Sequence, residues 1–141
     1  AYERALAGNA VSVIARETPL LVPIVEEGWR GHPAARMIVE EYLKPMRGKI
    51  DTLILGCTHY PIMKPLIKSV AGPAVRLVDG SIETASTVRE MLVAFGTLSP
   101  RTTGGALTIY FTDLSDSARE LTRRVVAGGR VVLKSAAAPT G

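Results

Sequence analysis

One short run holds the side chains of this chain that are best suited to acid–base or nucleophilic chemistry. Cys57 is the only cysteine, and His59, one of two histidines, follows it within Gly56-Cys57-Thr58-His59-Tyr60-Pro61. A thiolate can act as a nucleophile or a base, and a nearby imidazole can donate to it or accept from it. We therefore predict a candidate active site at Cys57 and His59. The alternative is that Cys57 fills a small apolar space, as free cysteines often do.

The elements predicted on either side of this run would place Cys57 at the end of a strand. Residues 52–55 are apolar and branched enough to form a buried strand, and Gly56 allows a sharp exit from it. Ligands of open α/β sheets bind outside the carboxyl ends of the strands. Pro61 suits a helix start, and apolar residues recur at helical spacing after it. A helix amino end beside the loop would favour the thiolate over the thiol.

Further strands and helices are predicted along the rest of the chain. Apolar runs predict strands at 11–15, 75–78, 107–112 and 130–134, and helical periodicity predicts helices at 2–6, 33–46, 82–95 (with Ser81 as N-cap) and 115–126. Pro23 interrupts the apolar segment 20–29, which favours a loop or a broken helix start there. His32 is explained as an exposed helix start. Alternating strands and helices predict a parallel, three-layer α/β architecture with right-handed crossovers.

Composition narrows the classes of protein that the chain can belong to. Its 141 residues are 47% hydrophobic, which suits one compact α/β domain, and no run approaches the ~20 apolar residues of a membrane span. The net charge is +4, but the basic residues are scattered, so we expect no nucleic-acid partner. A single cysteine rules out an internal disulfide and fits a reducing compartment, so we expect a cytoplasmic protein.

Two motifs resemble those of a known family. The run Gly56 to Pro61, after a strand ending in Leu-Ile-Leu, resembles the signature of glutamate racemase in the aspartate/glutamate racemase superfamily. The run Pro-Ile-Val-Glu, which ends at Glu26, is similar to the family's Pro-Leu-Val-Glu. The resemblance extends from Ala1 to about Thr112 and suggests the C-terminal portion of such an enzyme. It implies two similar α/β lobes, with residues 1–78 in the second lobe, 79–134 returning to the first, and 135–141 forming a flexible tail.

The resemblance also implies a role for each site residue. Cys57 would exchange the Cα proton of glutamate on the L-glutamate side, without pyridoxal phosphate or a metal. Thr58 would bind the substrate, His59 would hold the substrate or donate toward Cys57, and Glu26 would orient His59. The alternative that does not depend on the family is that Glu26 and Glu27 belong to the first turn of a helix, where the helix dipole stabilises carboxylates.

Inversion through a planar carbanion needs a base on one face and an acid on the other, so Cys57 alone cannot racemise glutamate. The family's first lobe, with its own cysteine, is absent from these residues. We therefore expect an inactive isolated chain whose partner is a missing N-terminal lobe, and a homodimer stays open. The expected function is interconversion of L- and D-glutamate for peptidoglycan biosynthesis. The alternatives are a superfamily racemase acting on aspartate or a hydantoin, and a non-catalytic interaction module.

Overall fold

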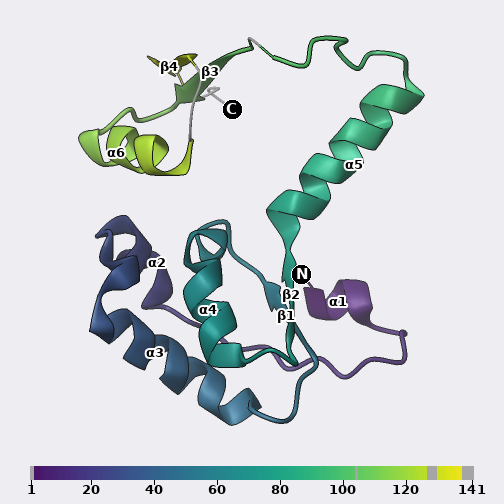
Figure 1. Cartoon of the computed structure of the whole chain (residues 1–141), viewed down its shortest axis with the longest axis vertical. Coiled ribbons are helices and arrows are strands. Elements are labelled where there is room, and N and C mark those ends of the chain that lie inside the picture. The colour runs from purple at the N-terminus through teal and green to yellow at the C-terminus, as the bar shows by residue number, and fades with distance from the viewer. Residues whose placement is uncertain (1, 104, 127–129, 138–141) are drawn as a thin grey trace. The chain divides into compact units, whose positions relative to one another are not determined.

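The computed structural model describes residues 2–103, 105–126 and 130–137. The chain forms two compact units that meet within one helix, between Val88 and Arg89 (Figure 1). Each unit contains its own two-stranded parallel sheet. Parallel strands need a crossover connection, and in both units that crossover contains a helix. The predicted α/β class with parallel strands is therefore confirmed.

The sheet of the first unit consists of β1 (Thr52–Leu55) and β2 (Arg76–Asp79). Thr52 lies opposite Arg76 and Leu55 opposite Asp79, so both strands end at the same edge of the sheet. The crossover between them contains the 3-10 helix η3 (Tyr60–Met63) and α4 (Lys64–Ala71). The strand predicted at 52–55 is confirmed, and the one predicted at 75–78 is shifted by one residue. The loop with the candidate residues thus leaves the carboxyl end of β1.

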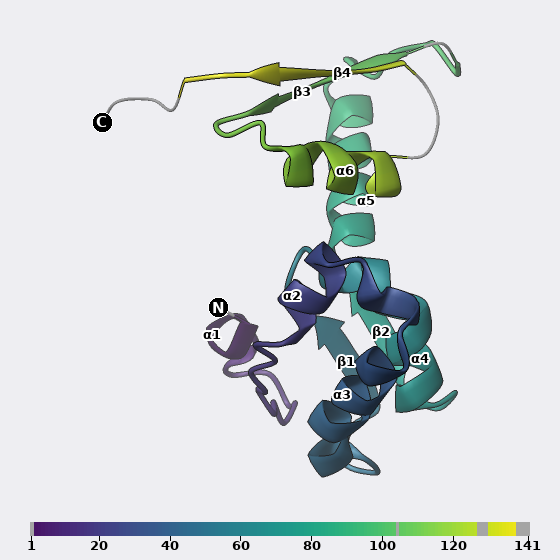
Figure 2. The same cartoon turned by 90° about the vertical axis from the view of Figure 1, so that its left-hand side faces the viewer.

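Helix α3 (Pro33–Leu43) packs beside α4 and supplies much of the core (Figure 2). Its buried residues Ala35, Val39 and Leu43 recur every four positions, so they form one face of the helix. Val39 is only 1% exposed. His32 is the N-cap, and its Nδ1 accepts a hydrogen bond from the Ala34 N–H at 3.2 Å, which confirms the helix start predicted there. The 3-10 helix η2 (Lys44–Met46) continues from α3.

The segment before α3 departs from the prediction at one place. Helix α1 (Tyr2–Leu6) is present as predicted. The strand predicted at 11–15 is wrong: these residues form no strand, and Val11, Val13 and Ile14 are 40–57% exposed. A strand needs a neighbouring backbone to pair with, and the described part of the chain offers none to this segment.

Two short helices follow the extended segment. Helix α2 (Leu21–Glu26) begins two residues before Pro23, so the proline stands in its first turn, where it is tolerated. The broken helix start predicted for this segment is therefore present. Gly28, at φ +74° in the left-handed region that glycine adopts readily, then leads into the 3-10 helix η1 (Trp29–Gly31).

Helix α5 (Gly80–Ala94) links the two units and has no buried residue. The prediction that Ser81 is its N-cap is wrong. The helix begins at Gly80, two residues earlier than predicted, and the Asp79 carboxylate accepts the hydrogen bond from the Ser81 N–H at 3.1 Å. An aspartate just before a helix satisfies a free N–H there more strongly than a neutral hydroxyl does.

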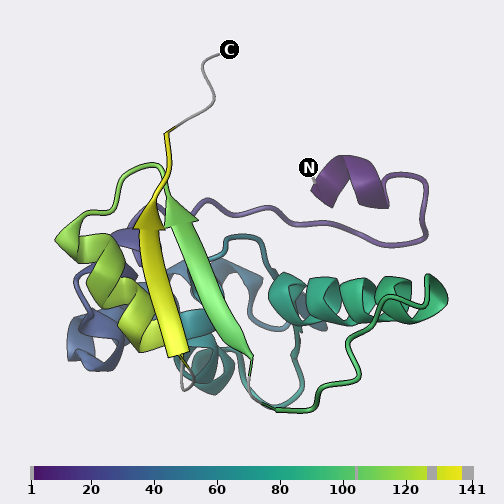
Figure 3. The same cartoon turned by 90° about the horizontal axis from the view of Figure 1, so that it is seen from above.

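The second unit is a single β–α–β crossover. It contains β3 (Ala106–Phe111), α6 (Asp116–Val125) and β4 (Arg130–Ser135), with Ala106 opposite Arg130 (Figure 3). The Ser115 hydroxyl caps α6 by accepting from the Ala118 N–H at 3.2 Å. The strands predicted at 107–112 and 130–134 and the helix predicted at 115–126 are confirmed to within one residue at each end.

The predicted lobes and the predicted C-terminal tail are tested only in part by the structure. The assignment of residues 1–78 and 79–134 to two lobes stays a prediction. Of the predicted tail 135–141, Ser135 ends β4, and 138–141 lie outside the described residues. Among the helices that the structure describes, none combines the length and the apolar character needed to cross a membrane.

Candidate active site

The candidate loop begins where β1 ends and turns directly into η3. Leu55 is the last, buried residue of the strand, and Cys57 is half-buried two residues later. The Cys57 carbonyl accepts from the Tyr60 N–H at 3.2 Å, and the His59 carbonyl accepts from the Ile62 N–H at 3.1 Å. These two backbone bonds close the turn. They hold the thiol and the imidazole on one short, internally bonded segment.

The thiol and the imidazole face each other across this turn. Cys57 Sγ lies 3.7 Å from Nδ1 of His59, within hydrogen-bond distance for sulfur. Either atom can be the donor, depending on which ring nitrogen carries the proton. A proton can therefore pass between sulfur and imidazole, or an imidazolium can stabilise a thiolate.

The other nitrogen of His59 contacts a carboxylate from a different element. Nε2 lies 3.5 Å from Oε1 of Glu26, the last residue of α2. A carboxylate at Nε2 fixes the ring orientation and favours the tautomer with the proton on Nε2, which leaves Nδ1 free to accept from the thiol. The Glu26 side chain is 52% exposed, so solvent weakens the contact. The structure thus brings Cys57, His59 and Glu26 together in that order.

The dipole explanation of Glu26 and Glu27 is wrong. Glu26 is the last residue of α2 and Glu27 is the C-cap, so both lie at the negative end of the helix dipole. Thr58, between Cys57 and His59, is exposed. Its predicted contact with a substrate stays a prediction, as do the predicted roles of Cys57, His59 and Glu26.

Sequence reasoning missed a charged pair at the same edge of the sheet. Asp79 ends β2 opposite Leu55 and is only 6% exposed. Its carboxylate accepts from the Ser81 hydroxyl at 2.6 Å and from Lys64 Nζ at 3.2 Å. The Ser81 hydroxyl above all, and then the Lys64 ammonium, lower the pKa of Asp79 below its ordinary value, although burial acts in the opposite direction. Lys64 begins α4, directly after η3, so this pair ties the end of the candidate loop to β2.

The sequence held a signal for Asp79 but none for its partner. Asp-Gly-Ser after an apolar run is typical of a turn in which the aspartate bonds the backbone two residues on. Lys64 sits at a helix start, where a solvent-exposed side chain is the ordinary expectation. Its ion pair with Asp79, fifteen residues away, depends on the parallel pairing of β1 and β2.

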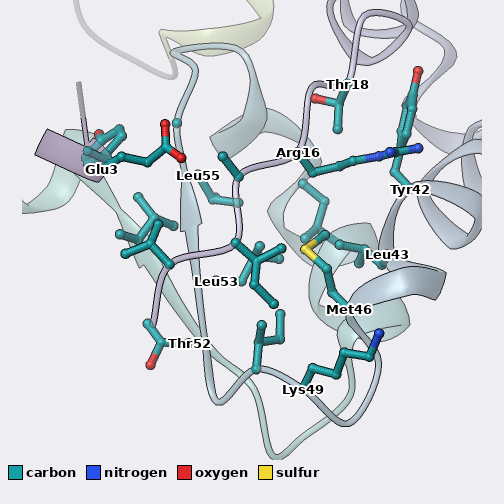
Figure 4. A pocket seen from close by; sticks show the side chains of 18 of the residues that line it. Glu3, Arg16, Thr18, Tyr42, Leu43, Met46, Lys49, Thr52, Leu53 and Leu55 are labelled. Carbon is teal, nitrogen blue, oxygen red and sulfur yellow. The ribbon is translucent and has the colours of Figure 1, made fainter. Parts of the chain in front are cut away.

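A cavity of about 760 Å³ lies beside β1, and Gly56 and Tyr60 of the candidate loop belong to its lining (Figure 4). Leu53, Leu43 and Met46 contribute to an apolar wall, and Arg16 and Tyr42 bring polar groups. Cys57, His59 and Glu26 do not line it. The unpaired segment 11–15 forms another part of its lining, so we interpret the cavity as a packing gap between that segment and β1. Within the described ranges, the candidate site included, no three His, Cys, Asp or Glu side chains gather closely enough to hold a metal ion.

Together, the parallel β–α–β units and the thiol–imidazole–carboxylate series at a strand's carboxyl end define an α/β protein with a candidate acid–base site. The comparison with family models finds no match. Individual relatives and solved structures do match.

The glutamate racemase of Chlorobaculum parvum is 42% identical over 116 residues, which cover 82% of this chain and 43% of that protein. The crystal structure of glutamate racemase isoform RacE1 from Bacillus anthracis matches with a TM-score of 0.84 at 27% identity, over 99% of this chain and 53% of that chain. The crystal structure of glutamate racemase from Francisella tularensis in complex with D-glutamate matches with a TM-score of 0.71 at 28% identity. The match covers 84% of this chain and 44% of that chain.

The chain is therefore related in sequence and in fold to glutamate racemases, which confirms the resemblance predicted from Gly56 to Pro61. It spans about half the length of the relatives that it matches.

Proposed function

We propose that this chain is part of a glutamate racemase, an isomerase that interconverts L- and D-glutamate. The observation that carries the proposal is the series Cys57–His59–Glu26 at the end of β1, in a chain related to glutamate racemases. The Francisella tularensis relative has D-glutamate bound, which supports glutamate as the substrate. The reaction would supply D-glutamate for peptidoglycan biosynthesis. A reduced thiol is needed, so the cytoplasm is the proposed compartment.

Cys57 is the acid–base group on one face of the substrate. Its thiolate takes the Cα proton: the C–H bond breaks, an S–H bond forms, and the electron pair stays on the substrate as a planar carbanion. In the reverse direction the Cys57 thiol returns a proton to the same face. Thr58, exposed beside Cys57, contacts the bound substrate.

His59 and Glu26 hold the thiol ready for this step. When His59 is protonated, its Nδ1–H donates to the Cys57 thiolate across 3.7 Å, and the Glu26 carboxylate stabilises the imidazolium from the Nε2 side. The proton balance is internal, because the proton that leaves the thiol is held on the imidazole. These residues supply the chemistry of one face without a metal or pyridoxal phosphate taking part.

The opposite face needs a second acid–base group. Cys57 is the only cysteine of these 141 residues, so we propose that this group belongs to another part of the enzyme, in the lobe that residues 79–134 rejoin. In this proposal residues 1–78 carry the Cys57 face. The relatives are about twice as long as this chain, which leaves room for such a lobe.

Racemisation assays on two forms of the protein test the proposal. The first form is the 141-residue chain, and the second is the chain extended to the length of its relatives. We expect no conversion of L- to D-glutamate by the first form and conversion by the second, with aspartate as the control substrate. Conversion by the 141-residue chain alone would contradict the two-face account. A failure of the extended form with glutamate but success with aspartate would favour another racemase of the superfamily.

A further inference from the structure

The start of α2 is held by two tyrosine hydroxyls that come from different elements. The hydroxyls of Thr18 and Tyr60 share a hydrogen bond at 2.5 Å in a partly buried place. The Leu20 N–H donates to the hydroxyl of Tyr42 at 3.2 Å. Tyr60 belongs to the candidate loop and begins η3, whereas Tyr42 belongs to α3. The segment that leads into α2 is thus attached to the loop by one bond and to α3 by the other.

Helix α2 depends on such outside attachments. It has six residues, its N-cap Leu20 makes no side-chain cap bond, and Pro23 lacks an N–H. A helix of this length is not stable by itself. Its position against the candidate loop is set by the burial of Leu21, Ile24 and Val25 and by the Thr18–Tyr60 bond, whereas the Leu20–Tyr42 bond attaches its start to α3.

The opposite end of α2 carries the contact on which the site depends. Glu26 ends the helix and lies 3.5 Å from Nε2 of His59, the residue directly before Tyr60. Two contacts therefore join α2 and its lead-in to the same loop: Thr18 to Tyr60 at the start, and Glu26 to His59 at the end. A separation of 3.5 Å is at the outer limit for a hydrogen bond, so a small displacement of the helix would break the second contact.

We propose that Thr18 and Tyr60 are positioning residues, whose shared hydrogen bond holds α2 against the Cys57–Tyr60 loop so that Glu26 reaches His59. The inference rests on the proposed function only in taking Cys57, His59 and Glu26 as the reacting series. Tyr42 holds the same helix start to α3 and makes no bond to the loop. It therefore offers a matched control, because its variant loses a tyrosine hydroxyl near α2 without loosening the loop.

The test uses the rate at which iodoacetamide alkylates the 141-residue chain at fixed pH. Cys57 is the only cysteine, so the rate reports on one site and needs no substrate. Glu26→Gln should slow the reaction about two- to fivefold, the range that a partly exposed charged contact supports, because the imidazolium that stabilises the thiolate loses its partner. We expect Tyr60→Phe and Thr18→Val to slow it by the same factor. Thr18→Ser and Tyr42→Phe should react as the unchanged chain does.

Double variants separate positioning from an independent effect. If the Thr18–Tyr60 bond acts through Glu26, then adding Glu26→Gln to Tyr60→Phe produces no further slowing. Multiplied effects in the double variant, unchanged rates in both single variants, or a slow Thr18→Ser chain would overturn the proposal.

The thermal unfolding of each variant is measured beside its alkylation rate, to show whether the variant is folded. Loss of the fold in both Tyr60→Phe and Thr18→Val would also overturn the proposal, because the bond would then hold the whole unit and not one contact. If the alkylation pattern is as expected but the chain extended to the length of its relatives does not racemise glutamate, the proposed function is contradicted and the positioning role remains.

Discussion

At the scale of single residues, the candidate site consists of the series Cys57–His59–Glu26, and a buried carboxylate lies at the same edge of the sheet. Two contacts link Cys57, His59 and Glu26: Cys57 Sγ lies 3.7 Å from Nδ1 of His59, and Nε2 of His59 lies 3.5 Å from Oε1 of Glu26. Asp79, 6% exposed, accepts hydrogen bonds from Lys64 and Ser81 at the end of the neighbouring strand. Removing one partner of a buried charged contact leaves the other without compensation, so such residues affect stability strongly.

Asp79→Asn should lower the free energy of unfolding at neutral pH by about 1–3 kcal/mol, because Lys64 loses its counter-charge and Ser81 its strongest acceptor. Chemical denaturation followed by circular dichroism measures this loss. Asp51→Asn is the control, because Asp51 is exposed in the same unit. Equal stability of the Asp79→Asn and Asp51→Asn chains would contradict the structural role of Asp79.

The same carboxylate gives stability a defined pH dependence. The pKa of Asp79 is lower in the folded chain than its ordinary value of 3.8, so the folded state binds this proton less tightly than the unfolded state does. Its contribution is therefore complete above 3.8 and is lost as the pH falls through the lowered folded value. The unchanged chain should lose stability over that acid range more steeply than Asp79→Asn does. Parallel slopes of the two unfolding curves against pH would contradict the assignment.

At the scale of elements, the helices and strands form where local sequence and packing agree. The run 52–55 could be predicted as a strand because branched apolar residues end at a glycine, and α3 because Pro33 begins an apolar face of helical periodicity. The strand expected at 11–15 did not form, because strand pairing depends on a neighbouring backbone that the apolar pattern cannot reveal. The N-cap of α5 was misjudged by two residues, because Ser81 and Asp79 can both cap a helix.

Helix α3 provides the clearest test of the core. Val39→Ala should destabilise the first unit by about 1–3 kcal/mol, because Val39 is 1% exposed and the loss of its methyl groups leaves a cavity in the core beside α3. Met37→Ala in the same helix is the control, since Met37 is 69% exposed and should change stability by less than about 0.5 kcal/mol. Thermal melts of the two variants make the comparison. A larger loss from Met37→Ala than from Val39→Ala would contradict the packing of α3.

At the scale of the whole molecule, the chain supplies one face of the proposed reaction and spans about half the length of its relatives. Cys57 and His59 could be found from the sequence because their types and spacing are rare in it. Glu26 could be linked to His59 only through the family resemblance, because no local pattern brings the end of α2 to the loop after β1. Lys64 and the Thr18–Tyr60 bond could not be predicted, because each joins elements that meet only in the folded unit.

The central claim is that Cys57 is the acid–base group of one face, and deuterium exchange tests it most directly. The experiment uses the protein extended to the length of its relatives, with Cys57→Ala, in deuterated water. Inversion should be abolished in both directions, because each direction needs both faces. The second acid–base group can still remove and return a proton on its own face, so D-glutamate should retain slow Cα exchange and L-glutamate should not. Equal exchange from both enantiomers, or racemisation at the rate of the unchanged protein, would contradict the account.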